Sequence, residues 1–294
     1  MRGAGEKHMG QTNSAIEDVK DTADEVAEKV GKHPWTERLA RVGYAAKGVV
    51  YIVVGALAVL TALGFGGKAK GTQGAMSSIA RQPFGKVLLS IVAFGLIAYA
   101  LWRWVQAVTD ADDKGTKAKG IALRLGYAGS GFIYAGLAIS AARTVLGAND
   151  DGKPSAAESW TASVMEFPFG QWLVALAGFG VIGYGLYQCY KGYKAKFRKR
   201  LKEGEMSERG IKWAARCGRV GFIARGIVFL IVGGFLIEAA LRYDSSQAEG
   251  LDGVLQALVQ QSFGPWLLGG MALGLVAYGL YMLIEARYRR IAGS

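Results

Sequence analysis

The stretch RVGYAAKGVVY at residues 41–51 decides the fold, because closely similar stretches occur twice more along the chain. Residues 124–134 read RLGYAGSGFIY, and residues 219–229 read RVGFIARGIVF. One arginine, two glycines and two aromatic residues therefore recur at the same offsets. Self-similarity of this kind is the sequence signature of a repeat architecture. We expect three structurally equivalent units.

A second shared block follows each copy. It consists of a Phe-Gly pair, then a glycine, then a tyrosine at constant spacing. Its members are Phe84, Gly85, Gly95 and Tyr99; Phe169, Gly170, Gly180 and Tyr184; and Phe263, Gly264, Gly274 and Tyr278. The residue before Phe-Gly is proline twice and serine once. Each unit is thus a long apolar segment, a loop and a second long apolar segment.

The apolar segments are long enough to cross a membrane. Hydrophobic residues make up 51% of the 294-residue chain and fall in blocks. A helix needs about 20 residues to cross the ~30 Å hydrocarbon core of a bilayer. The six predicted spans are residues 42–64, 84–108, 124–146, 168–192, 217–241 and 264–286. Burying six such helices in a soluble protein of this size would require more polar sequence than the chain contains, and the runs lack the alternation of a β-barrel. The sequence predicts an all-α polytopic membrane protein built from three tandem two-helix repeats.

The outer loops carry a further pattern. They cover about residues 65–83, 147–167 and 242–262, and each contains a few apolar residues shortly before Phe-Gly. This pattern predicts a short interfacial helix in every outer loop. Because each repeat has an even number of spans, the repeats keep one orientation. We expect them to surround a pseudo-threefold axis along the membrane normal.

Lysine and arginine residues predict the orientation. Seven lie at or before position 41, and eleven lie from Lys191 to Arg219. The loops between the two spans of each repeat hold few. Positive residues stay on the cytoplasmic side, so we expect both termini inside a bacterial plasma membrane. The polar first 41 residues contain no signal-peptide core. The net charge of +12 then reflects the orientation of the protein in the membrane, and we expect no nucleic-acid partner.

The chain divides into six predicted segments. Residues 1–37 form a polar cytoplasmic segment, in which residues 14–32 have the apolar spacing of an amphipathic helix. The others are repeat 1 at 38–108, repeat 2 at 120–192, a basic cytoplasmic linker at 193–213, repeat 3 at 214–288 and a cytoplasmic tail at 289–294.

A candidate inner polar network lies one turn beyond the repeated arginine. Lys47 and Arg225 occupy equivalent positions, with Ser130 in the middle repeat. Glu285 lies near the inner end of the sixth span, at a position that is polar in every repeat. Ionisable residues within spans usually pair with one another or mark a functional site. Both interpretations stay open: pairing that holds helices together, and a site for an anion.

Two further repeated sets are candidates for contacts. Arg41, Arg124 and Arg219 lie at the predicted inner ends of the odd spans, where they anchor the protein to lipid phosphate or form a ring that attracts an anion. Tyr99, Tyr184 and Tyr278 form the identical set in the even spans. Their hydroxyl groups need partners when buried, across the bundle or in a shared cavity.

The sequence contains little that supports catalysis. The two histidines, His8 and His33, lie outside the predicted spans, and no zinc motif or phosphate-binding loop is present. Cys189 and Cys217 have no metal-type spacing. We expect neither enzymatic activity, nor a metal, nor a cofactor.

The triplicated Arg-x-Gly-Tyr/Phe block and the Phe-Gly block resemble the bacterial six-span membrane family of three tandem two-span repeats catalogued as a domain of unknown function (DUF1206). The resemblance covers about residues 38–288. It implies the architecture and no activity. We expect a structural, lipid-interacting or complex-associated membrane component, whose partners are anionic phospholipid and a second membrane protein. The alternative is a transporter or channel for a small anionic solute through a pseudo-threefold central cavity.

Overall fold

The fold consists of long helices, as expected. The computed structural model describes residues 34–64, 80, 84–109, 118–147 and 156–290. Six described helices are long and apolar enough to cross a membrane. They are α2 (Pro34–Ala62), α4 (Gly85–Val108), α5 (Ala118–Val145), α7 (Gly170–Tyr193), α8 (Glu208–Arg242) and α10 (Gly264–Tyr288). This confirms the predicted polytopic all-α class. The amphipathic helix expected at residues 14–32 lies outside the described residues.

Short helices occupy the described loops between the two spans of repeats 2 and 3. They are α6 (Ala156–Met165) and α9 (Leu251–Val259), each ending a few residues before Phe-Gly. The prediction for the first outer loop falls almost entirely outside the described residues. Three short 3₁₀ turns, η1 (Lys196–Arg200), η2 (Glu203–Glu205) and η3 (Ser245–Gln247), complete the described elements.

Three spans, α2, α5 and α8, begin earlier than the hydropathy pattern indicates. α8 starts at Glu208, nine residues before the predicted boundary, and its N-terminus is capped by the Ser207 side chain, which accepts a hydrogen bond from the Gly210 amide at 3.2 Å. α2 starts at Pro34, a residue suited to the first helical position. Good helix formers continue α2 and α8 past the apolar segment. Hydropathy therefore locates the segment that can enter the membrane, whereas capping residues locate the start of the helix.

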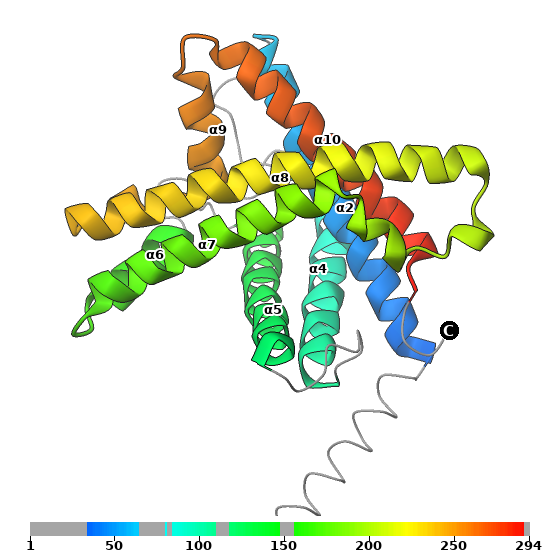
Figure 1. Cartoon of the computed structure of the whole chain (residues 1–294), viewed down its shortest axis with the longest axis horizontal. Coiled ribbons are helices and arrows are strands. Elements are labelled where there is room, and N and C mark those ends of the chain that lie inside the picture. The colour runs from blue at the N-terminus through cyan, green and yellow to red at the C-terminus, as the bar shows by residue number, and fades with distance from the viewer. Residues whose placement is uncertain (1–33, 65–79, 81–83, 110–117, 148–155, 291–294) are drawn as a thin grey trace, which may run out of the picture.

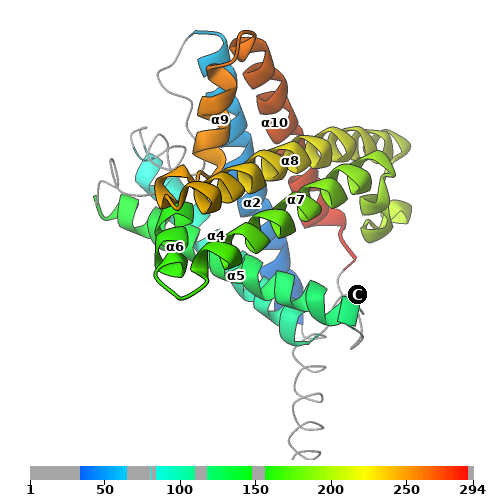
Figure 2. The same ribbon diagram turned by 60° about the vertical axis from the view of Figure 1, so that its left-hand side comes forward.

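The six helices form three antiparallel pairs that cross one another (Figures 1 and 2). Two pairs join consecutive spans, α4 with α5 and α7 with α8, and the third joins α2 to α10. Glycines face glycines within the pairs: a Cβ on Gly48 would lie 2.8 Å from the Gly279 carbonyl oxygen, and one on Gly226 would lie 2.8 Å from that of Gly185. Small residues at such contacts let helices pack closely in a membrane.

The pairs meet where the two helices of one repeat cross. In repeat 1, Gly43 lies against the Tyr99 backbone, and a Cβ there would be 2.6 Å from the Tyr99 Cα. Repeat 3 makes the same contact between Gly221 and Tyr278, at 2.5 Å. The second glycine of each repeat contributes too, since Gly95 lies against Ala46 as Gly274 lies against Ala224. In repeats 1 and 3, the recurrent Gly and Tyr positions are therefore helix-crossing positions.

The Phe-Gly block joins the short loop helix of a repeat to the next span. A Cβ on Gly170 would lie 2.0 Å from the Val164 carbonyl oxygen, and one on Gly264 would lie 2.1 Å from that of Val259. The loop helix thus ends directly against the start of α7 or α10, which only glycine allows. The preceding phenylalanine is largely exposed in all three repeats. The phenylalanine ring therefore takes little part in the packing of this junction.

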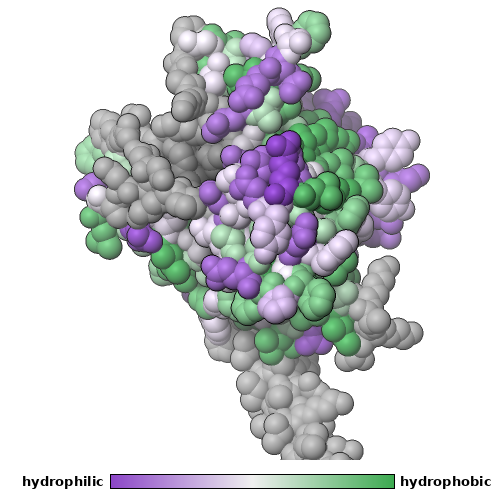
Figure 3. Space-filling model, turned by 90° about the vertical axis from the view of Figure 1, so that its left-hand side faces the viewer, coloured by the Kyte–Doolittle hydropathy of each residue, from purple (hydrophilic) through white to green (hydrophobic). Residues whose placement is uncertain are grey.

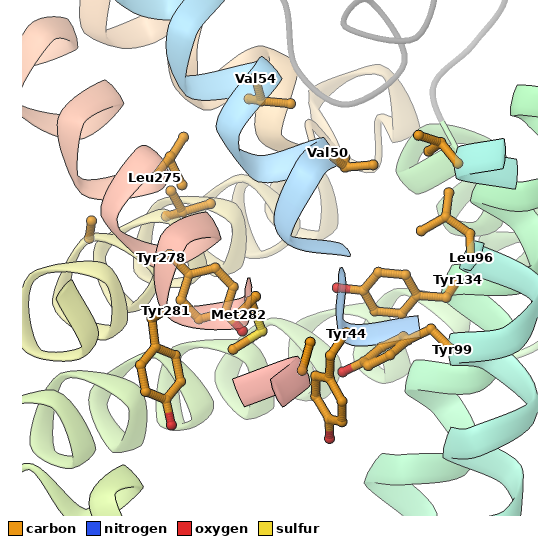
Figure 4. Packing of buried hydrophobic residues seen from close by; sticks show 14 of the residues in the cluster. Tyr44, Val50, Val54, Leu96, Tyr99, Tyr134, Leu275, Tyr278, Tyr281 and Met282 are labelled. Atoms are coloured by element: carbon orange, nitrogen blue, oxygen red, sulfur yellow. The ribbon is translucent and has the colours of Figure 1, made fainter. Parts of the chain in front are cut away.

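Large apolar side chains cover broad areas of the surface (Figure 3). Examples are Phe132 on α5 and Phe179 on α7, which are more than 60% exposed. The core is instead rich in tyrosine and small residues (Figure 4). An apolar exterior around a partly polar core is the arrangement that a bilayer favours.

Candidate functional site

Aromatic contacts join the repeats at equivalent points. Each joint pairs the motif tyrosine of an even span with an aromatic residue of an odd span in a neighbouring repeat. The pairs are Tyr99–Tyr134, Tyr184–Phe229 and Tyr278–Tyr51, with ring centroids 4.6, 5.0 and 4.8 Å apart and edge-to-face geometry. Such pairs add to packing beyond the area that they bury. The three predicted tyrosines therefore occupy equivalent positions in the joints.

Lys47 lies among these rings. Its side chain is 1% exposed, and its Nζ donates a hydrogen bond to the Tyr99 hydroxyl at 3.0 Å. The same Nζ lies 4.7, 4.9 and 5.6 Å from the ring centroids of Tyr99, Tyr134 and Tyr278. Cation–π attraction stabilises an ammonium group in such surroundings. Lys47 thus contacts tyrosines from all three repeats.

Arg225 makes the equivalent contact in repeat 3. Its Nη1 donates to the Tyr278 hydroxyl at 2.7 Å, and its guanidinium lies 4.9 Å from the centroid of Phe229. In repeats 1 and 3, the cation of the odd span thus donates a hydrogen bond to the motif tyrosine of the even span. Ser130 replaces the cation in repeat 2, where Tyr184 is 44% exposed while Tyr99 and Tyr278 are buried.

Arg103 adds a third cation that the predicted network does not include. It donates to the Tyr99 hydroxyl and to Gln106 Oε1, the latter at 3.0 Å. Its guanidinium also lies 5.2 Å from the ring centroid of Tyr127 on α5. Arg103 lies one helical turn after Tyr99, so the two side chains share a face of α4. This spacing is the feature of the sequence that could have identified Arg103 as a member of the network.

Glu285 belongs to a neighbouring cluster. It forms a salt bridge with Arg289, one turn further along the chain, and both side chains are almost fully buried. The Arg289 guanidinium lies 4.8 Å from the ring centroid of Tyr44, which in turn packs edge-to-face on Tyr99. Aromatic contacts therefore connect Glu285 to the network, and no direct pair with Lys47 or Arg225 occurs among the described residues.

The repeated arginines fall into two groups. Arg124 donates to the carbonyl oxygens of Ala107 and Val108, both at 2.7 Å, at the C-terminus of α4. Arg41 donates to the carbonyl oxygens of Ala286 and Arg287 at the C-terminus of α10. Both guanidinium groups thus bind the end of a neighbouring helix. Arg219 is exposed and lines a pocket.

That pocket has a basic lining and a volume of about 620 Å³. It lies where the chain leaves α7, beside α8 and the end of α10. Its lining residues are Lys194, Ala195, Arg198, Lys199, Leu201, Glu203, Arg219 and Arg290. Glu203 is the acidic one, and it accepts two hydrogen bonds from Arg198 at 2.8 and 3.0 Å. These bonds raise the pKa of the Arg198 guanidinium above its ordinary value. Lys194, Lys199, Arg219 and Arg290 leave the pocket strongly positive.

The described part of the chain contains no candidate metal site. No group of three His, Cys, Asp or Glu side chains is close enough to hold a metal ion there. Both histidines lie outside the described residues. Cys189 and Cys217 are free thiols.

Comparison with known proteins identifies the repeats. The family model for "Domain of Unknown Function (DUF1206)" matches residues 42–110, 125–195 and 220–289. An uncharacterized protein, YxxB, of Bacillus subtilis (strain 168) is 38% identical over 258 residues, which is 88% of this chain and 93% of that protein. No solved structure matches. The three matches coincide with the three helix–loop–helix units.

Proposed function

The chain belongs to the DUF1206 family, and from this premise we propose that it is a non-catalytic, multi-pass plasma-membrane protein that binds anionic phospholipid head groups. The basic pocket beside Arg219 is the observation that carries this proposal. It unites cationic side chains from the 194–203 segment that follows α7, from α8 and from the residues after α10. Lysine and arginine are the residues that recognise phosphate in proteins.

The pocket's surroundings support a place at the membrane surface. Tyr193, directly before it, is 72% exposed, and Trp213 on α8 is 61% exposed. Exposed Tyr and Trp at helix ends are typical of the head-group region. A group of four basic side chains beside an acidic leaflet attracts lipid by about 1 kcal/mol per well-placed charge.

The orientation that we propose places this pocket on the cytoplasmic side. The pocket, the N-terminal end of α2 and the C-terminal end of α10 lie on one side of the molecule, because Arg290 lines the pocket and Arg41 binds the end of α10. The 191–219 segment, which supplies Lys194, Lys199 and Arg219 to the pocket, carries eleven basic residues. Positive residues of short loops stay inside, which favours the cytoplasmic face.

The test is lipid-dependent thermal stability in nanodiscs. We compare phosphatidylcholine discs with discs containing phosphatidylglycerol, for the wild type and for a Lys199→Gln/Arg290→Gln variant. We expect phosphatidylglycerol to raise the Tm of the wild type, and the variant to lose most of that shift. Arg209→Gln/Lys212→Gln removes two exposed charges of α8 that do not line the pocket, and it should keep the shift. Equal losses in both variants would contradict a built site and leave only diffuse surface attraction.

A second candidate function rests on the central cations. Lys47, Arg103 and Arg225 converge on the tyrosine cluster, and Arg103 Nε and Arg225 Nε are buried without a hydrogen-bond acceptor among the described residues. This arrangement supports transport of a small anionic solute. The measurement is the stabilisation of detergent-purified protein by a panel of anions. Selective stabilisation that is lost in both Lys47→Ala and Arg225→Ala would support it, whereas an unselective fall in Tm would assign these charges to helix packing.

A further inference from the structure

Two of the three repeats form a helix crossing that the third does not form. In repeats 1 and 3, α2 packs on α4 and α8 packs on α10. In repeat 2, α5 and α7 form no comparable packed interface. The six helices therefore make an open series, α5–α4–α2–α10–α8–α7, instead of a closed ring. We call the unfilled junction between the ends of this series the α5–α7 seam.

The residues of the seam carry the same crossing motif as the formed junctions. Gly126 is equivalent to Gly43 and Gly221, and Gly180 is equivalent to Gly95 and Gly274, by the repeat offsets. The four equivalents have backbone or Ala Cβ atoms within 2.6 Å of a built Cβ. Gly126 and Gly180 have no such heavy atom within 4 Å. The crossing surface of repeat 2 is thus present in the sequence and unused in this structure.

Exposure follows the same division. Ile133 on α5 is 66% exposed, whereas its equivalents Val50 and Val228 are 5% and 7% exposed. Tyr184 on α7 is 44% exposed, against 0% and 1% for the tyrosines of the other repeats. α5 and α7 are also the least buried of the six spans. Residues that are buried at the crossings of repeats 1 and 3 are therefore exposed in repeat 2.

The segment that joins α5 to α7 is long enough to allow these two helices to cross. The segments between the two spans of a repeat are residues 63–84, 146–169 and 243–263, which are closely similar in length. The segment of repeat 2 is thus as able to bridge a crossed pair as the other two. The loop helix α6 and the Phe169-Gly170 junction are also built as in repeat 3.

We propose that α5 and α7 close on each other in a second state, with Gly126 against the backbone of Tyr184 and Gly180 against Gly129, and that the protein alternates between an open and a closed ring. Equivalence to α2–α4 and α8–α10 defines the closed geometry. Ser130 then faces the Tyr184 hydroxyl, as Lys47 faces Tyr99 and Arg225 faces Tyr278. The open state exposes this junction laterally to the bilayer.

Cysteine cross-linking tests the closure. Ile133→Cys and Ala177→Cys lie one turn from Gly129 and Gly180, and their equivalents in repeat 1, Val50 and Val92, are both in the buried core. With Cys189 and Cys217 replaced by alanine, these are the only thiols in the chain. We expect a short bifunctional thiol reagent to link them within one chain in membranes. A link between two chains would assign the seam to a second copy and overturn the proposal.

Two glycine substitutions on α5 provide the matched comparison. Gly126→Ala places a Cβ where closure puts the Tyr184 backbone, so it should lower the intrachain cross-link about tenfold. Gly136→Ala should leave it unchanged, because the equivalents of Gly136 are Val53 and Ile231, which carry side chains in formed repeats. Neither Cβ meets an atom within 4 Å in the open state, so both variants should fold.

Two outcomes of the cross-linking experiment would contradict the closed state. Equal cross-linking in the two glycine variants would show that the link does not require the repeat geometry. Failure of the parent pair to link, while a monofunctional maleimide labels both cysteines, would show that the ring stays open. Either result overturns the closed state.

Discussion

Arg124 and Arg41 hold the C-terminal ends of two different helices through equivalent carbonyl groups. Arg124 binds the carbonyl oxygens of Ala107 and Val108, and Arg41 binds those of Ala286 and Arg287, which occupy the same positions of the repeat. The last carbonyl groups of a helix have no partner within it, and the helix dipole favours a cation there. In two of its three copies, the repeated arginine therefore joins an odd span to the even span beside it.

Replacing this arginine should loosen the joint. We expect Arg124→Gln to destabilise the protein by about 1–2 kcal/mol, because it removes two charge-assisted hydrogen bonds and a favourable dipole interaction. The measurement is equilibrium unfolding in detergent. Arg219→Gln is the control, since Arg219 is exposed and lines the basic pocket. A larger loss for Arg219→Gln than for Arg124→Gln would contradict the capping role.

The size of the residue at position 47 should matter more for stability than its charge. Lys47 is buried and its Nζ lies against three tyrosine rings, so Lys47→Ala leaves a cavity that we expect to cost about 2–4 kcal/mol. Lys47→Met fills similar volume without the charge and should cost less than about 1.5 kcal/mol. Unfolding free energies of the two variants make the comparison. If Lys47→Met is as damaging as Lys47→Ala, the ammonium group itself holds the cluster together.

The repeats made much of the fold predictable. The same arginine, glycine and aromatic positions recurred in three contexts, and hydropathy located all six spans. Equivalence also predicted that Lys47 and Arg225 play matching roles, and each does bind its motif tyrosine. A periodic signal is strong because every copy repeats the same physical constraint.

Contacts between distant segments were harder to predict. Glu285 pairs with Arg289, which lies beyond the sixth predicted span, and the basic pocket assembles from α8, the residues after α10 and the segment that follows α7. Hydropathy says which residues enter the membrane but not which helices become neighbours. The partly open ring is the clearest example, because all three repeats carry the crossing glycines and two use them.

Breaking the Glu285–Arg289 pair from one side should be strongly destabilising. Both side chains are almost fully buried, so Glu285→Gln leaves the arginine charge without its carboxylate. Removal of one member of a buried pair costs about 3–5 kcal/mol, while replacement of both by apolar groups is often nearly neutral. We therefore expect Glu285→Leu/Arg289→Met to be more stable than either single variant.

A double-mutant cycle of unfolding free energies measures that coupling. The single variants Glu285→Leu and Arg289→Met complete the cycle. A coupling energy near zero would mean that the two side chains act independently, which would contradict the buried pair as a unit.

Adjacent glycines on α8 offer the sharpest test of the helix packing. A Cβ on Gly233 would lie 2.8 Å from the Gly178 carbonyl oxygen of α7, whereas one on Gly234 would meet no such atom within 4 Å. Gly233→Ala must force the α7–α8 pair apart and should cost about 1–3 kcal/mol. Gly234→Ala should be neutral or stabilising by up to about 1 kcal/mol, because alanine favours a helix over glycine. Thermal unfolding of both variants decides the point: equal Tm values would mean that α7 and α8 do not meet through these glycines.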